Sequence, residues 1–287
     1  MKKISFLALF CALTLSTFAQ NQKETRTLPL FTGIDASSAF SIELKRGDTQ
    51  SVVIECDAQY MPDIKTEVKG GVLHLYYKSP VINRRINSAF RAYITITDLD
   101  FLDLSGASSI ASTDLFTPKR FRADLSGASK VFGLRINTND AGVEISGASV
   151  INIEIECDRA SFDFSGSGRG KVSGKISQCN LGLSGASKAE FFIHTDQISL
   201  EASGACNTNI KGEANRAKVS VSGASTLQAQ NFIVKEMKIS ASGASKASVH
   251  VTELLSPTLS SSSRLDYQGS PRIDNLRVTS GASINNR

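Results

Sequence analysis

The chain has 287 residues, of which 41% are apolar, 21% charged and 7% aromatic, and it contains no tryptophan. This composition excludes an intrinsically disordered chain and a bundle of membrane helices. The formal net charge of only +5 also makes the protein a poor candidate for binding nucleic acid, which requires a dense basic surface.

Residues 1–19 predict a signal peptide. Lys2 and Lys3 form a basic start, residues 4–15 an apolar stretch, and residues 17–19 (Thr-Phe-Ala) a small-x-small cleavage site. We therefore expect cleavage after Ala19 and an exported protein, located in the periplasm, on the cell surface or outside the cell. No later stretch reaches the ~20 apolar residues of a spanning helix, so we expect no transmembrane anchor in the mature chain.

Residues 20–100 predict an N-terminal β cap built from hairpins. The alternating runs 41–45 and 51–56 flank the polar segment 46–49, and the runs 64–68 and 72–77 flank a segment that contains Gly70 and Gly71. Each pair of runs is typical of a β-hairpin. A cap of this kind would cover the open edge of the structure that follows, because an uncovered edge recruits other strands.

Two short motifs lie in the same segment. Residues 33–40 look like an irregular forerunner of the repeat described next, so the segment would include an early coil. Arg46, Gly47 and Asp48 spell an integrin-binding tripeptide, but polar turn residues are expected at this place in any case. We therefore interpret the tripeptide as a turn.

Residues 101–287 repeat the phrase Ser-Gly-Ala-Ser, or a close variant, at intervals of 18 to 21 residues. A degenerate copy lies at residues 260–263. Regular recurrence at this period is typical of a solenoid. The glycines of the other copies are Gly106, Gly127, Gly147, Gly166, Gly185, Gly204, Gly223, Gly243 and Gly281.

The residues around each copy predict β-structure. Apolar residues stand two and four positions before the glycine, such as Ile145 and Val143, and six positions after it, such as Ile153. A period of two indicates strands, and the frames of leucine-rich and calcium-binding nonapeptide repeats are absent. We therefore predict an all-β, single-stranded parallel β-helix with about ten coils of 19–20 residues, each holding two or three short strands stacked ~4.8 Å from the next.

The small residues of the phrase suit a corner between strands. Glycine permits a positive φ, and the serine hydroxyls can satisfy backbone groups left unpaired at the bend. Only three histidines occur and no G-x-S-x-G motif, so the serines do not predict a catalytic triad. Cys56, Cys157, Cys179 and Cys206 form no C-x-x-C pair, and we interpret them as small core residues.

One polar pattern recurs three residues before the corner glycine. These positions lie between inward-facing ones, so we expect a column of outward acidic side chains at coil spacing. The column comprises Asp103, Asp124, Glu144 and Asp163, followed by Gly182 and then Glu201. Stacked like charges repel, so we expect an opposing charge to offset them.

Two interpretations of the acidic column remain open. In the first, Arg122 and Lys130 screen the acids and the face only keeps the protein soluble. In the second, Asp103, Asp124, Glu144 and Asp163 bind calcium or a cationic ligand, because close carboxylates suit hard cations. No other cofactor and no defined metal site is expected.

The sequence resembles an exported bacterial family on three features. Residues 31–48 have the form F-x-G-I-D-A-S-S-A-F-S-I-E-L-K-R-G-D, residues 70–75 the form G-G-V-L-H-L, and L-S-G-A-S phrases then recur. This combination is similar to the family called "putative auto-transporter adhesin, head GIN domain". The resemblance implies a right-handed β-helix and a role in surface adhesion, and it supplies no catalytic residues. Nothing in the chain resembles a membrane translocator barrel.

Together these observations predict a non-enzymatic, exported binding module of the cell envelope. Adhesion to a surface glycan or protein is the leading hypothesis. The alternatives are a periplasmic scaffold that meets protein partners and a glycan-active β-helix enzyme that uses two carboxylates of the column. The enzyme is disfavoured because the chain has no long insertions to wall a cleft and no tryptophan to stack a sugar.

Overall fold

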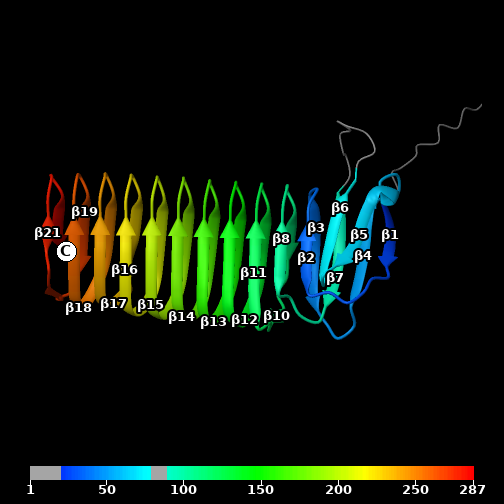
Figure 1. Ribbon diagram of the computed structural model, residues 1–287, viewed down its shortest axis with the longest axis horizontal. Coiled ribbons are helices and arrows are strands. Elements are labelled where there is room, and N and C mark those ends of the chain that lie inside the picture. The colour runs from blue at the N-terminus through cyan, green and yellow to red at the C-terminus, as the bar shows by residue number, and fades with distance from the viewer. Residues whose placement is uncertain (1–20, 79–88) are drawn as a thin grey trace, which may run out of the picture.

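The computed structural model describes residues 21–78 and 89–287, which stack into a β-solenoid of about ten turns (Figure 1). This confirms the predicted parallel solenoid. The predicted signal peptide and its cleavage after Ala19 lie outside the described residues. No helix within the described residues is long and apolar enough to cross a bilayer.

The repeated region is built from strands β8 to β22. From β12 to β18 each coil is one continuous strand of 14 to 16 residues, where two or three short strands were expected. The strands are β8 (Phe101–Leu104), β9 (Ser109–Ala111), β10 (Leu115–Phe116), β11 (Arg120–Leu125), β12 (Lys130–Ile145), β13 (Val150–Phe164), β14 (Arg169–Leu183), β15 (Lys188–Ala202), β16 (Asn207–Val221), β17 (Thr226–Ala241), β18 (Lys246–Leu259), β19 (Arg264–Gln268), β20 (Arg272–Ile273), β21 (Arg277–Val278) and β22 (Ser283–Asn286).

Each long strand bends once, which gives a coil two arms. The exit arm leaves one Ser-Gly-Ala-Ser turn, and after the bend the entry arm leads to the next turn (Figure 1). Inward side chains of both arms fill the space between them. Val143 and Ile145 of the entry arm and Ile153 of the exit arm are all buried, which confirms the predicted core positions.

Consecutive coils stack in register. Val143 pairs with Phe162 and Ile145 with Phe164, so equivalent residues of successive coils lie beside each other. A single coil could not bury its apolar side alone, and the neighbouring coil completes the core.

The turns continue the same ladder. The N–H of Ala128 donates to the carbonyl of Gly106 at 2.7 Å, and the N–H of Ala148 donates to that of Gly127 at the same distance. Gly127 has a φ of +68°, and a Cβ on it would lie 2.5 Å from the Gly106 carbonyl oxygen. The corner therefore needs glycine both for its backbone angle and for the close approach of the next turn.

The N-terminal region contains seven strands and a short 3₁₀ helix. They are β1 (Asn21–Arg26), β2 (Gly33–Ala36), β3 (Phe40–Arg46), β4 (Ser51–Asp57), η1 (Met61–Asp63), β5 (Ile64–Lys69), β6 (Val72–Tyr77) and β7 (Phe90–Ile96). β2 and β3 form a coil, because β2 pairs with β8 and β3 with β9, both in parallel. The forerunner of the repeat is thus a true coil of the stack.

The order of these coils in space differs from their order in the chain. β6 pairs with β2 and β7 with β3, so the β6–β7 pair lies on the far side of the β2–β3 coil from β8. The chain therefore returns past the β2–β3 coil before the regular region begins. β1 pairs with β4 and β5 with β6, both antiparallel.

Only one of the two predicted hairpins forms. The runs 64–68 and 72–77 pair as the β5–β6 hairpin. The prediction that the runs 41–45 and 51–56 pair was wrong, because β7 lies between β3 and β4 and pairs with both. Phe90, Ala92 and Ile94 of β7 are buried, so this strand needs partners on both edges.

The four described cysteines are all free. Cys56, Cys179 and Cys206 are buried and Cys157 is half-buried. Burial raises the pKa of the Cys56 thiol to about 11 and that of Cys157 to about 12, so neither is a reactive thiolate at neutral pH.

Candidate functional site

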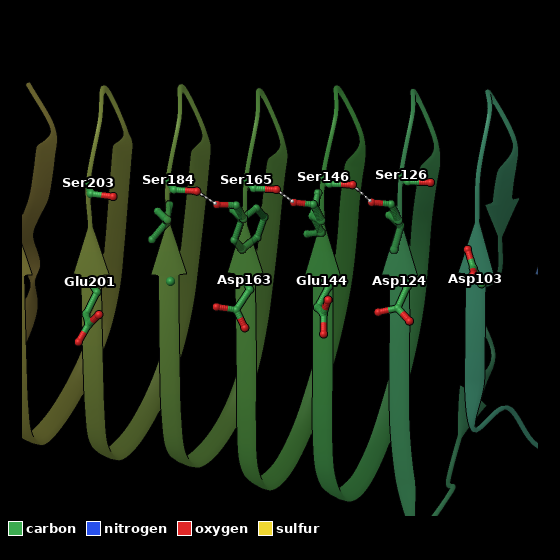
Figure 2. Close-up of a pocket in the computed structure, with 15 residues that line it drawn as sticks. Asp103, Asp124, Ser126, Glu144, Ser146, Asp163, Ser165, Ser184, Glu201 and Ser203 are labelled. Atoms are coloured by element: carbon green, nitrogen blue, oxygen red, sulfur yellow. Dashed lines mark hydrogen bonds between the residues drawn. The ribbon is translucent and has the colours of Figure 1, made fainter. Parts of the chain in front are cut away.

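The acidic column lies where the sequence places it, on the outer side of the entry arm (Figure 2). Parallel register sets Asp124 beside Asp103 on one side and Glu144 on the other. Asp163 follows Glu144, and Gly182 and Glu201 continue the column. The structure thus brings the four predicted residues together at coil spacing, ~4.8 Å from one strand to the next.

The column extends beyond the predicted residues toward the N-terminus. Asp35 of β2 pairs with Asp103, and His74 of β6 pairs with Asp35. The Nδ1 atom of His74 lies 2.8 Å from Oδ2 of Asp35. Asp35 was within reach of sequence reasoning, because Ile34-Asp35-Ala36 alternates as Leu102-Asp103-Leu104 does. His74 had no such signal, because its position depends on a coil out of chain order.

Charge crowding in the column affects Asp103 most clearly. Partial burial, and then the carboxylates of Asp35 and Asp124, raise the pKa of Asp103 above its usual value. No cation is paired with Asp103 among the described ion pairs. Asp103 therefore lies in an environment that disfavours its charge.

The predicted screening by cations is present farther along. The Nη2 atom of Arg122 lies 2.9 Å from Oε1 of Glu144, and its Nε atom lies 3.4 Å from Oδ2 of Asp124. Lys130, the other predicted screening residue, begins the exit arm of β12. Arg122 is half or more exposed, so its ion pairs contribute little to stability, but they reduce repulsion between two neighbouring acids.

Gly182 interrupts the column at a position that the Asp163 carboxylate covers. A Cβ on Gly182 would collide with Oδ1 of Asp163, so the Asp163 carboxylate leans over the position that a side chain would fill. Ser161 donates a hydrogen bond to the other oxygen of Asp163 at 3.1 Å. Asp163 is thus oriented by its neighbours without any cation.

A groove of about 490 Å³ follows the column. Its second wall is the row of serines that begin the turns, Ser126, Ser146, Ser165, Ser184 and Ser203 (Figure 2). Three of these hydroxyls donate to the backbone: Ser146 to the carbonyl of Leu125 at 3.2 Å, Ser165 to that of Ile145 at 3.3 Å and Ser184 to that of Phe164 at 3.4 Å. They are therefore structural groups, as the turn interpretation predicts, and the carboxylates are the charged groups of the groove.

The arrangement offers charge but no chelating cluster. Within residues 21–78 and 89–287, no three aspartate, glutamate, histidine or cysteine side chains converge closely enough to hold a metal ion. Carboxylates one coil apart can instead meet a ligand whose positive charges are spread along the axis of the solenoid.

The tripeptide at residues 46–48 is held by the fold. The Arg46 guanidinium donates to the carbonyls of Thr97 at 3.1 Å and Leu115 at 2.9 Å, and to Oγ1 of Thr117 at 3.1 Å. Its backbone N–H donates to Asp114 at 2.7 Å. A guanidinium with these internal partners supports the structural interpretation of this turn.

Comparisons with known proteins agree with this architecture. The sequence matches the model of a family described as "Putative auto-transporter adhesin, head GIN domain" over residues 30–192 and 177–271. The fold is similar to a crystal structure described as a putative adhesin from Parabacteroides merdae ATCC 43184, with a TM-score of 0.51 and 15% identity over 93% of this chain and 96% of that one.

Two further crystal structures from Parabacteroides distasonis ATCC 8503 also match. One is described as a putative adhesin, with a TM-score of 0.49 and 16% identity over 94% of this chain and 98% of that one. The other is described as a putative lipid binding protein, with a TM-score of 0.46 and 18% identity over 93% and 96%. No curated protein matches the sequence.

Proposed function

Because the chain belongs to the family described as "Putative auto-transporter adhesin, head GIN domain", we propose that it is a non-enzymatic, exported binding module of the cell envelope that acts as an adhesin. The family match and a rigid, open binding face support this proposal. The acidic groove along Asp103, Asp124, Glu144 and Asp163 is the face that meets the ligand.

The groove is the observation that best supports a binding role. Its carboxylates stand on strands that are paired on both edges, so they are fixed before a ligand arrives. Fixed groups lose little conformational freedom on binding, which favours affinity. An extended ligand with repeated ammonium groups, such as a lysine-rich segment of a surface protein, is complementary in charge to a row of carboxylates.

Calcium remains a second candidate ligand of the column. Neighbours such as Glu144 and Asp163 offer two carboxylates, whereas calcium takes six to eight oxygen ligands. We therefore expect only weak calcium binding, and calorimetry at millimolar calcium measures it.

A non-enzymatic role fits the openness of the face. Two carboxylates at coil spacing resemble the pair of a retaining glycosidase in separation alone. The raised pKa of Asp103 follows from burial and from its acidic neighbours, which a ladder of like charges produces without catalysis. Release of reducing sugars or unsaturated products from a panel of glycans would establish the enzyme alternative and overturn this part of the proposal.

Ligand binding by the groove is tested with a lysine-rich peptide. The double variant Glu144→Gln, Asp163→Asn removes two charges of the column, and we expect binding to weaken on the order of tenfold at low ionic strength. The matched control, Glu156→Gln with Glu253→Gln, removes two exposed carboxylates from outside the column and should change binding less than about twofold. Equal losses in the two double variants would contradict a specific groove.

The cellular role is tested by protease shaving of intact cells. An adhesin is cleaved from the outside, and antibody to the chain then finds fragments in the medium. If the protein is fully protected from protease on intact cells and is cleaved only after the outer membrane is opened, adhesion is excluded and the periplasmic scaffold becomes the proposed role.

A further inference from the structure

An exposed aromatic ring on the exit arm is flanked by two lysines. Phe192 of β15 is 38% exposed, which is unusual for a phenylalanine in this chain. The Nζ atom of Lys171, from the preceding coil, lies 5.6 Å from the ring centroid, and that of Lys211, from the following coil, lies 5.1 Å away. Both distances are within the range of a cation–π interaction.

More positive charge surrounds this ring. Arg169 and Lys175 lie on the same coil as Lys171, and both are exposed. With Lys171, Phe192 and Lys211 they form what we call the Phe192 patch. None of its four cations is in an ion pair of the described part of the chain. Of the nearby acids, Glu190 lies 3.6 Å from Lys188 and Glu213 lies 3.2 Å from His194, while Glu156 stands beside Lys175 in the strand register.

The ring of Phe192 also restricts the conformations of the two lysines beside it. A lysine side chain that is free in solvent samples many rotamers, and fixing it costs conformational entropy. Phe192 favours positions of two ammonium groups near its faces, one from each neighbouring coil. The patch is therefore a partly preorganised set of positive charges, none of which is in an ion pair within the described residues.

We propose that the Phe192 patch binds an acidic polysaccharide, a linear glycan that bears carboxylate or sulfate groups. The patch spans three consecutive coils, β14 to β16, so its charges are distributed along the axis of the solenoid as the acids of a linear polymer are along its chain.

Other anions fit the patch less well. Single-stranded nucleic acid needs free ring faces on which bases stack, and here lysines lie over the ring of Phe192. A lipid surface is entered by clusters of large apolar side chains, whereas the ring is surrounded by charge. This inference goes beyond the proposed function, because it adds a second binding surface of opposite charge on the other arm from the acidic groove.

The experiment measures binding of the purified protein to polygalacturonate at low ionic strength. We expect saturable binding that weakens with salt, and we expect the double variant Lys171→Ala, Lys211→Ala to bind on the order of tenfold more weakly. The matched control, Lys218→Ala with Lys238→Ala, removes two exposed and neighbouring lysines from the entry arm and should change the affinity less than about twofold.

A third variant tests the ring itself. Phe192→Leu keeps an apolar side chain and both lysines, and we expect a two- to fivefold loss of affinity, because the cation–π contacts are worth about 0.5–1 kcal/mol at an exposed site. Circular dichroism and the melting temperature of each variant show that the solenoid is intact.

Three results would overturn the proposal. The first is an equal loss of affinity for polygalacturonate in the two lysine double variants. The second is binding of neutral dextran as tight as that of polygalacturonate. The third is tighter binding of oligothymidylate or of anionic vesicles than of polygalacturonate. The outcome is independent of cell-surface location: a protein protected from shaving would end the adhesin role and leave the measured glycan binding in place.

Discussion

The regular region, β8 to β22, and the N-terminal region, β1 to β7, use the same stacking in different ways. In the regular region each coil pairs with the next one along the chain, so the period of the sequence is enough to predict which coils are neighbours. In the N-terminal region the β6–β7 pair follows the β2–β3 coil in the chain but lies on its outer side. A repeat specifies its own register, whereas an irregular segment depends on contacts between residues far apart in sequence.

The turns show the same contrast. The corner of the β2–β3 coil has Ser38 and Ala39 at φ of +66° and +64°, and Ser38 stands where most later coils have glycine. These side chains are tolerated although the left-handed conformation is strained for them. From Gly127 to Gly243 another turn packs directly against the corner glycine, and a Cβ there would meet backbone. The last corners are less crowded: Ser261 takes the glycine position at a φ of +59°, and a Cβ on Gly281 would lie 3.8 Å from the Ser261 carbonyl oxygen.

The largest expected effect on the free energy of unfolding is at two glycines that share a φ of +68°. Gly106 begins the regular region, and a Cβ on it would lie 3.4 Å from Ser38 N, whereas one on Gly127 would lie 2.5 Å from Gly106 O. We expect Gly106→Ala to lower the free energy of unfolding by about 1–2 kcal/mol, from φ strain alone.

Gly127→Ala adds a clash with backbone, and we expect a loss of about 3–5 kcal/mol. The midpoints of urea denaturation of the two variants measure the difference. Equal losses would show that the stacking of turns does not require glycine.

The sequence predicted the regular region well because its signal is repeated. Apolar residues equivalent to Val143, Ile145 and Ile153 recur in most coils, so the inward and outward faces follow from alternation and period, and with them the column of Asp103, Asp124, Glu144 and Asp163. Single exceptions in one coil do not obscure such a pattern.

The sequence predicted the N-terminal region poorly because its signals are local and the decisive contacts are not. Runs 41–45 and 51–56 have the composition of a hairpin, yet β7 pairs with both of them. Neither the insertion of β7 nor the place of His74 beside Asp35 leaves a trace in nearby residues. The Phe192 patch also escaped prediction, because a single exposed ring and scattered lysines become a cluster only when coils are stacked.

A smaller effect is expected at Arg46, which ties the β2–β3 coil to the first regular coil. Its guanidinium donates to the carbonyls of Thr97 and Leu115 and to Thr117. Arg46→Ala should lower the free energy of unfolding by about 1–2 kcal/mol, and Arg46→Lys should restore less than half, because an ammonium cannot reach three acceptors in this geometry. Thermal denaturation measures both variants.

Asp48→Glu tests whether the tripeptide at residues 46–48 has a role in cell attachment. If residues 46–48 form a structural turn, attachment of integrin-bearing cells is the same for Asp48→Glu and for the unmodified protein. A loss of attachment with unchanged melting temperature would assign the tripeptide a recognition role.

The smallest effect is expected at Asp103, where the two regions meet through Asp35. Because its pKa is raised in the folded protein, the native state keeps this proton to higher pH than the unfolded chain does. The group therefore favours folding most at low pH, and its contribution is lost as the pH rises through the native pKa, above the ordinary value of 3.8. At pH 7 the ionised carboxylate destabilises the fold.

Asp103→Asn keeps the shape of the side chain and removes its charge. We expect it to raise the melting temperature on the order of 1 °C at pH 7, and to have a smaller effect at pH 3, where the carboxyl is largely protonated in the native protein. Glu201→Gln is the control, because Glu201 has Gly182 and Ser220 beside it instead of acids, and we expect it to change the melting temperature at pH 7 less than Asp103→Asn does. A stabilisation by Asp103→Asn that is the same at both pH values would mean that packing, and not repulsion from Asp35 and Asp124, sets the environment of this residue.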